Sequence, residues 1–164
     1  MVLDTLPSVS HIAKQLKGLL GTTVIAKDCP PGLLHGNPQV PTFTGMYATD
    51  RGEVSVVAIC SLPLAAATGA CLGLIPGAQA EEWITTGKVN PNGMENFNEI
   101  LNVLAGVFNE TRPNRHVRLQ TILQPGQMPA KPDIRALVGG RGPSVDMIIE
   151  IERYPTGKLT LRSR

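Results

Sequence analysis

Apolar and polar residues recur at helical spacing near the amino terminus of the chain. Between residues 7 and 20 the apolar side chains lie every three or four positions, which predicts an amphipathic helix. Ser8 or Ser10 is suited to cap its beginning, and Gly21 is suited to end it. The segment TTVIAKD, residues 22–28, predicts a strand directly after the helix.

A turn-rich loop separates this strand from a predicted β-hairpin. The loop, residues 29–41, contains four prolines and two glycines. Two strand-like segments follow at 42–49 and 53–60, and the turn residues DRG lie between them. The two segments therefore predict an antiparallel pair.

The second hairpin strand opens a run without any charged residue, from 54 to 80, which is long enough to cross a bilayer. The sequence inside the run argues against a membrane span. Residues 54–60 are rich in β-branched side chains, and Ser61 with Pro63 is typical of a helix start. A buried strand followed by a small-residue helix over about 62–74 explains the run better. We therefore expect no membrane insertion, with a membrane-associated or small-molecule-binding domain as an alternative.

The second half of the chain repeats the order of helix, strand, proline-rich loop and hairpin. A short predicted helix at 78–86 and a polar loop at 87–93 precede it. The segment MENFNEILNVLAGVFNE, residues 94–110, has the period of an amphipathic helix. Beyond it, the sequence predicts a loop at 124–132 and strands at 116–123, 133–139, 144–153 and 158–163.

This repetition predicts a pseudo-symmetric internal duplication within a single domain, residues 1–164, with half-repeats of about 6–76 and 93–162. Aligning Gly21 with Gly106 gives an offset of 85 residues and brings the two proline-rich loops into register. Two halves that each contribute a helix and a hairpin predict an α+β fold, in which a mainly antiparallel sheet is packed with helices.

Composition narrows the class of function. The chain carries a net charge of +2 and only 4% aromatic residues, so it lacks the basic and stacking surface that is typical of nucleic-acid binding. Its three cysteines have no metal-ligand spacing, and we interpret them as free thiols in a reducing cytoplasm. The three histidines also lack ligand spacing, so no metal site is expected in this chain.

The helix predicted at 94–110 has a polar stripe opposite its apolar face. On a helical projection Glu95, Glu99 and Asn102 fall within about 60° of one another, and Gly106 follows one turn later. Any surface helix has such a stripe. However, Glu95 and Glu99 repel each other at i, i+4, and the helix has no lysine or arginine. Asn102 and Gly106 are also poor helix formers, and these costs favour a surface that is presented to a partner.

The spacing of these residues resembles the motif of the CheC/CheX/FliY family of chemotaxis phosphatases. In that motif a surface helix carries (Asp or Ser)-x3-Glu-x2-Asn, and a proline follows x22. Glu99, Asn102 and Pro125 match this pattern, and the segment NVLAG, which ends at Gly106, resembles the family's continuation. Glu95 stands where the family has Asp or Ser. The resemblance implies a CheC-like fold.

The number of motif copies is closest to that of CheX-like members, which carry one. At the offset of 85 residues, Lys14 and Lys17 match Glu99 and Asn102, so the first predicted helix lacks the pair. CheX-like members pair as homodimers through sheet edges, and the resemblance implies a homodimer here. The last predicted strand, 158–163, or the hairpin strands would supply that edge.

The resemblance further implies a hydrolase that removes the aspartyl phosphate of a CheY-like response-regulator receiver. Asn102 would orient the attacking water, and Glu99 would pair with the receiver's active-site lysine. Glu95, Gly106 and Pro125 would contribute to partner binding. No cofactor is expected in this chain, because the receiver binds the Mg²⁺. A non-enzymatic receiver-binding or adaptor module of the same family is the alternative, since Glu95 departs from the motif.

Overall fold

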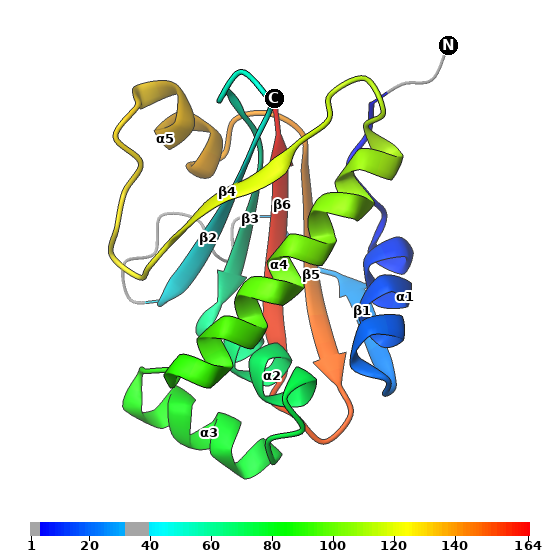
Figure 1. The fold of residues 1–164 in the computed structure, drawn as a ribbon, viewed down its shortest axis with the longest axis vertical. Coiled ribbons are helices and arrows are strands. Elements are labelled where there is room, and N and C mark those ends of the chain that lie inside the picture. The colour runs from blue at the N-terminus through cyan, green and yellow to red at the C-terminus, as the bar shows by residue number, and fades with distance from the viewer. Residues whose placement is uncertain (1–3, 32–39) are drawn as a thin grey trace.

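The computed structural model describes residues 4–31 and 40–164. In this part of the chain the centre is a six-stranded antiparallel sheet with the order β1-β5-β6-β3-β2-β4 (Figure 1). The strands are β1 (Val24–Asp28), β2 (Thr42–Ala48), β3 (Val54–Ser61), β4 (Arg118–Leu123), β5 (Ser144–Ile151) and β6 (Gly157–Ser163). The helices are α1 (Val9–Leu20), α2 (Leu62–Leu72), α3 (Gly77–Thr86), α4 (Pro91–Thr111) and α5 (Pro132–Val138).

Helices pack on both faces of the sheet, but unequally. α1, α2 and α4 cover one face, where Tyr47 and Val56 belong to the larger apolar core, and α3 packs against α2 (Figure 1). Side chains alternate along a strand, so Met46, which precedes Tyr47, and Val57, which follows Val56, point to the opposite face. There they form a smaller apolar cluster with Ile134 of α5.

The strand order is symmetric about the boundary between β6 and β3. Exchanging β1 with β4, β2 with β5 and β3 with β6 returns the same order, read from the other edge. α1 precedes β1 just as α4 precedes β4. The predicted α+β fold with an antiparallel sheet is confirmed, and the symmetric order is that expected of a duplicated unit, whose exact limits stay a prediction.

The uncharged run at 54–80 forms the centre of this fold. β3 is buried along its whole length between β2 and β6. Ser61 then caps α2 by accepting a hydrogen bond from the Leu64 N–H, and Pro63 lies in the first turn. The prediction of a buried strand followed by a helix is confirmed. Across the described ranges, no helix has the length and apolar composition needed to span a bilayer.

The helix ends do not coincide at the offset of 85 residues, because α4 is longer than α1. Gly21 ends α1 in the left-handed conformation, with a φ of 68°, as predicted. Gly106 instead lies inside α4, which continues to Thr111. α4 also begins earlier than predicted, because Asn90 caps it and Pro91 starts it. The conclusion about the first half still holds, since α1 contains neither glutamate nor asparagine.

The strand predicted at 133–139 is wrong, because this segment is the helix α5. Pro132 occupies the first turn, where its missing N–H leaves no bond unmade, and Asp133 suits the positive end of the helix dipole. Ile134 and Leu137 lie three residues apart, and both are buried. This spacing is helical, and the run is too short for periodicity alone to separate helix from strand.

The strands expected to form a free edge are internal. β6 lies between β5 and β3, and β2 and β3 are each flanked on both sides. β4 covers the outer side of β2, from the pair Thr44–Leu123 to the pair Ala48–Arg118. The edges of the sheet are therefore β1 and β4. The predicted loop at 29–41 leads into the hairpin of β2 and β3, and its residues 32–39 lie outside the described residues.

α4 crosses α2 through a contact between two glycines. Gly69 of α2 lies so close to Gly93 of α4 that a methyl group on Gly69 would collide with the Gly93 carbonyl. Further along α4, the Asn96 side-chain amide donates to the Gly69 carbonyl at 2.9 Å. The crossing therefore holds the amino-terminal half of α4 against α2.

Replacing Gly69 with alanine is expected to lower the free energy of unfolding by about 1–3 kcal/mol, because the added methyl group must push two helix backbones apart. Chemical denaturation measures this change. Gly18→Ala is the matched control, since Gly18 lies within α1 with open space at its Cβ position. The control should gain about 0.8–1.0 kcal/mol. Equal stability gains in both variants would contradict the close crossing.

Candidate functional site

α4 carries the residues of the predicted motif, and its apolar face docks it on the sheet. Phe97 packs edge-on against Phe43 of β2, with ring centroids 5.5 Å apart. Phe108, three turns further, packs edge-on against Tyr47 at 4.7 Å. Edge-to-face aromatic pairs are favourable beyond their buried area. The two pairs fix which side of α4 faces the sheet, near both ends of its buried face.

A buried hydrogen bond holds the middle of α4. The Tyr47 hydroxyl donates to the Leu101 carbonyl at 2.6 Å, and Tyr47 is fully buried. Burial raises the pKa of Tyr47 well above its ordinary value, so the hydroxyl keeps its proton and remains a donor. Gly45 leaves room for Leu101, because a Cβ at Gly45 would lie 3.2 Å from Leu101 Cδ1. These contacts fix the backbone immediately before Asn102.

The opposite side of α4 presents the motif residues. Glu95, Glu99, Asn102 and Gly106 are all exposed. Glu99 and Asn102 lie three residues apart, so their side chains share one face of the helix. Within residues 4–31 and 40–164, neither side chain has a hydrogen-bond or ion-pair partner. A carboxylate and a carboxamide are thus held next to each other and available to another molecule.

Gly106 leaves a bare patch in this row. No heavy atom lies within 4 Å of the position that its Cβ would occupy. Its backbone is therefore reachable from solvent, one turn beyond Asn102. A glycine at such a position permits close backbone approach by another chain.

Pro125 lies in the exposed turn that follows β4. The Gln127 N–H donates to the Gln124 carbonyl at 3.0 Å, and Gly126 has a φ of +85°. Proline at the second position and a glycine with positive φ at the third are the residues that a type II turn requires. The Gln127 side chain also accepts a bond from the Gln124 N–H at 2.7 Å. Pro125 therefore shapes the end of β4.

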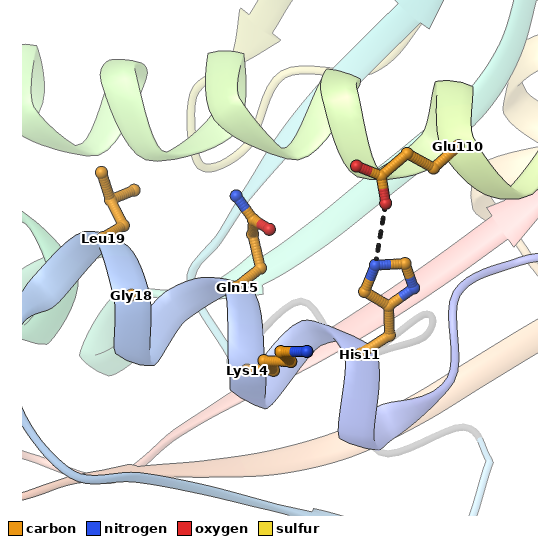
Figure 2. A pocket seen from close by; sticks show the side chains of 6 residues that line it. All are labelled: His11, Lys14, Gln15, Gly18, Leu19 and Glu110. Carbon is orange, nitrogen blue, oxygen red and sulfur yellow. Dashed lines mark hydrogen bonds and ion pairs between the residues drawn. The ribbon is translucent and has the colours of Figure 1, made fainter.

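A groove of about 520 Å³ lies between α1 and α4, beside the exposed row. Figure 2 shows Gln15 of α1 pointing towards α4, and His11 paired with Glu110. The His11 Nε2 and Glu110 Oε2 atoms are 3.2 Å apart. Glu110 lies one turn beyond Gly106, so the groove continues the polar surface of α4 towards α1.

Asn109 has a structural role that its sequence context does not reveal. Its side-chain amide donates to the Val117 carbonyl at 3.0 Å, and its side-chain oxygen accepts from the Val117 N–H at 2.8 Å. This pair of bonds ties the end of α4 to the residue before β4. On a helical projection Asn109 lies at the margin of the polar stripe, and nothing in the sequence separates it from Asn102.

The chemistry of this surface is that of hydrogen bonding and charge. Within the described part of the chain, no three His, Cys, Asp or Glu side chains gather in the manner of a metal site. The three cysteines are free thiols, and burial raises the pKa of Cys60 to about 12, which keeps that thiol protonated at neutral pH. The groups available on α4 are the Glu99 carboxylate and the Asn102 carboxamide.

No family model matches the sequence, and no curated protein matches it. Solved structures match in fold. The FliM middle domain from H. pylori gives a TM-score of 0.58 at 8% identity, over 94% of this chain and 84% of that one. Thermotoga maritima FliY gives 0.51 at 15% identity, over 94% and 83%. CheX from Borrelia burgdorferi, solved in a complex with CheY, BeF3 and Mg²⁺, gives 0.47 at 14% identity, over 94% of both chains.

The similarity to FliY confirms the resemblance to the CheC/CheX/FliY family at the level of the fold. The FliM middle domain shares this fold as well, which the sequence motif did not indicate. At identities of 8–15% the comparisons show the fold alone.

Gly106→Ala is expected to raise the free energy of unfolding by about 0.8–1.0 kcal/mol, because alanine is the better helix former and its methyl group enters open space. Chemical denaturation provides the measurement. Gly93→Ala in the same helix is the control, since its Cβ would lie 2.7 Å from Trp83, and we expect it to destabilise the fold. A loss of stability in Gly106→Ala would show that this position is packed.

Proposed function

We propose that the protein dephosphorylates the aspartyl phosphate of a CheY-like response-regulator receiver by inserting Glu99 and Asn102 of α4 into the receiver's active site. The observation that carries the proposal is the shared exposure of these two side chains on a helix that is rigidly docked. The motif spacing to Gly106 and Pro125, together with a fold similar to that of FliY, supports it.

Asn102 has the chemistry that the reaction needs. Hydrolysis requires a water molecule in line with the bond to be broken, and catalysis of phosphoryl transfer is mostly positioning and charge stabilisation. A carboxamide accepts a hydrogen bond from water through its oxygen and donates through its NH₂ group. It does so without adding a negative charge beside the phosphoryl group. We therefore assign Asn102 the role of orienting the attacking water.

Glu99 is assigned a different role, because a carboxylate facing a phosphate is repelled. Its charge suits a cation, and we propose that it pairs with the active-site lysine of the receiver. Glu95 would add a second negative charge for partner binding one turn earlier. Gly106 would let the receiver approach the backbone of α4. Pro125 would fix the conformation of the turn that follows β4.

Mg²⁺ would be supplied by the receiver, and this chain would hold no cofactor of its own. The protein would act in the cytoplasm, as its three free thiols suggest. It would form a homodimer through one of the two sheet edges, β1 or β4.

Asn102→Ala is expected to lower the rate of receiver dephosphorylation by roughly 10²-fold, because misplacing a reacting group by about 1 Å already costs that much. The measurement is phosphate release from a purified, phosphorylated receiver of the host. Asn98→Ala is the matched control, because Asn98 is also an exposed asparagine of α4. Loss of activity confined to Asn102→Ala supports the assignment, and wild-type activity in that variant refutes it.

Glu99→Gln is expected to raise KM for the phosphorylated receiver more than it lowers kcat, because an anchoring ion pair contributes equally to the ground state and the transition state. Steady-state kinetics separate the two parameters. Glu81→Gln on α3 removes an equal charge from another exposed position and should leave both unchanged. A large loss of kcat with KM unchanged would instead place Glu99 in the chemical step.

A receiver-binding or adaptor module without enzymatic activity is the second candidate. The departure at Glu95 and the similarity to FliM favour it, since solved structures hold FliM in complexes with FliG and with SpeE. Titration of a phosphorylated receiver separates the two functions. Tight binding that leaves the receiver's phosphate lifetime unchanged would favour the adaptor over the phosphatase.

A further inference from the structure

A second cleft lies at the carboxyl-terminal end of α4, where the segment before α1 passes the start of β5 and the end of β6. Its volume is about 340 Å³. It differs from the surface around Asn102 in its cationic lining. Residues in its wall include Asp4, Leu6, Arg112, Arg115, Val145 and Arg164.

Arg112 lines this cleft and forms no ion pair within the described residues. It lines the cleft although only 1% of its surface is exposed. Its Nη2 donates to the Ser55 Oγ at 2.9 Å, whereas its Nε is buried without a hydrogen-bond partner among the described residues. Burial, with the nearby charge of Arg115, lowers the pKa of Arg112. A buried cation is costly unless an anion or several hydrogen bonds compensate it.

The carboxylates around the cleft are engaged with other arginines. The Asp4 Oδ2 lies 3.7 Å from the Arg115 Nε, and Asp133 pairs with Arg164. Asp4 is close enough to favour the charged form of Arg112, but it forms no ion pair with it in the described part of the chain. The cleft thus combines one guanidinium that has no ion pair with a second, half-exposed one on its wall.

We propose that this cleft binds a phosphate group, free or carried by a small organic molecule, between Arg112 and Arg115. Guanidinium groups form short, charge-assisted hydrogen bonds to phosphate oxygens, often two at a time. A bound phosphate supplies the ion-pair partner that Arg112 lacks among the described residues. The phosphate also offers acceptor oxygens to Arg112. Among the described residues, the Arg112 guanidinium makes one hydrogen bond, to Ser55.

The size and lining of the cleft favour a small organic phosphate. Pockets for small molecules measure about 300–1,000 Å³, and this cleft lies at the lower end of that range. Leu6 and Val145 give it an apolar wall beside the two arginines. The phosphate would contact the arginines, and an apolar body would lie against these two side chains.

The inference is independent of the proposed phosphatase function. Arg112 follows Asn102 by ten residues, which is about 15 Å along a helix. A ligand at the end of α4 therefore leaves the exposed row around Asn102 uncovered. Receiver dephosphorylation and phosphate binding in the cleft fail or succeed separately.

Thermal denaturation of the full chain with inorganic phosphate or phenyl phosphate, at constant ionic strength set with sodium chloride, tests the proposal. At a concentration tenfold above Kd, the melting temperature should rise by roughly 3–6 °C. Phenyl phosphate should reach this rise at a lower concentration than inorganic phosphate. Arg112→Met should abolish the rise while keeping the fold, because a similar-sized apolar side chain replaces a buried charge.

Two further variants make the result decisive. Arg115→Gln, at a half-exposed position, should weaken the response and decides the matter if Arg112→Met does not fold. Lys88→Gln removes an equal charge from an exposed loop before α4 and should respond as the wild type does. An unresponsive wild type, or a response as large as that of the wild type in both Arg112→Met and Arg115→Gln, overturns the proposal. A response to phosphate that phenyl phosphate does not exceed assigns the cleft to free phosphate.

Discussion

The docking of α4 on β2 is the constraint on which the exposed surface of this protein depends. The contacts of Phe97 and Phe108 fix which side of the helix faces the sheet. The hydrogen bond from the Tyr47 hydroxyl to the Leu101 carbonyl fixes the distance of the helix from the sheet. A helix has no freedom to rotate once its apolar face is fixed in this way. The residues opposite that face, Glu99 and Asn102, are therefore held in place by contacts that they do not make themselves.

The sequence was sufficient for the features that depend on local periodicity. Apolar spacing identified α1, α4 and the hairpin. Gly21 marked the end of α1, and Ser8, one of the two serines suited to cap it, lies at its beginning. The exposed side of α4 followed from the same spacing, because the angular position of Glu99 and Asn102 is fixed by their distance from Phe97 along the chain. The repeated order of elements also indicated the symmetric sheet, although the two halves share little identity.

Features that depend on contacts distant in sequence were missed or misassigned. The sequence predicts a strand where α5 lies, because only the packing of α5 on Met46 and Val57 distinguishes its apolar spacing from that of a short strand. The sequence also predicts the wrong edge strands, since the order of the strands along the chain does not give their order in the sheet. The burial of Arg112 could not be predicted, because nothing in its local sequence shows that it lies beside Ser55 of β3.

The positions of β1 and β4 at opposite edges restrict how copies of this chain can associate through their sheets. The two edges come from different halves, so their sequences and exposed backbone groups differ. Joining β1 of one copy to β4 of another leaves one unmatched edge at each end, and such a contact adds further copies until a ring closes or a filament grows. Joining an edge to its own counterpart is isologous and stops at two subunits. A continuous twelve-stranded sheet in a closed pair therefore has a two-fold axis at either β1 or β4.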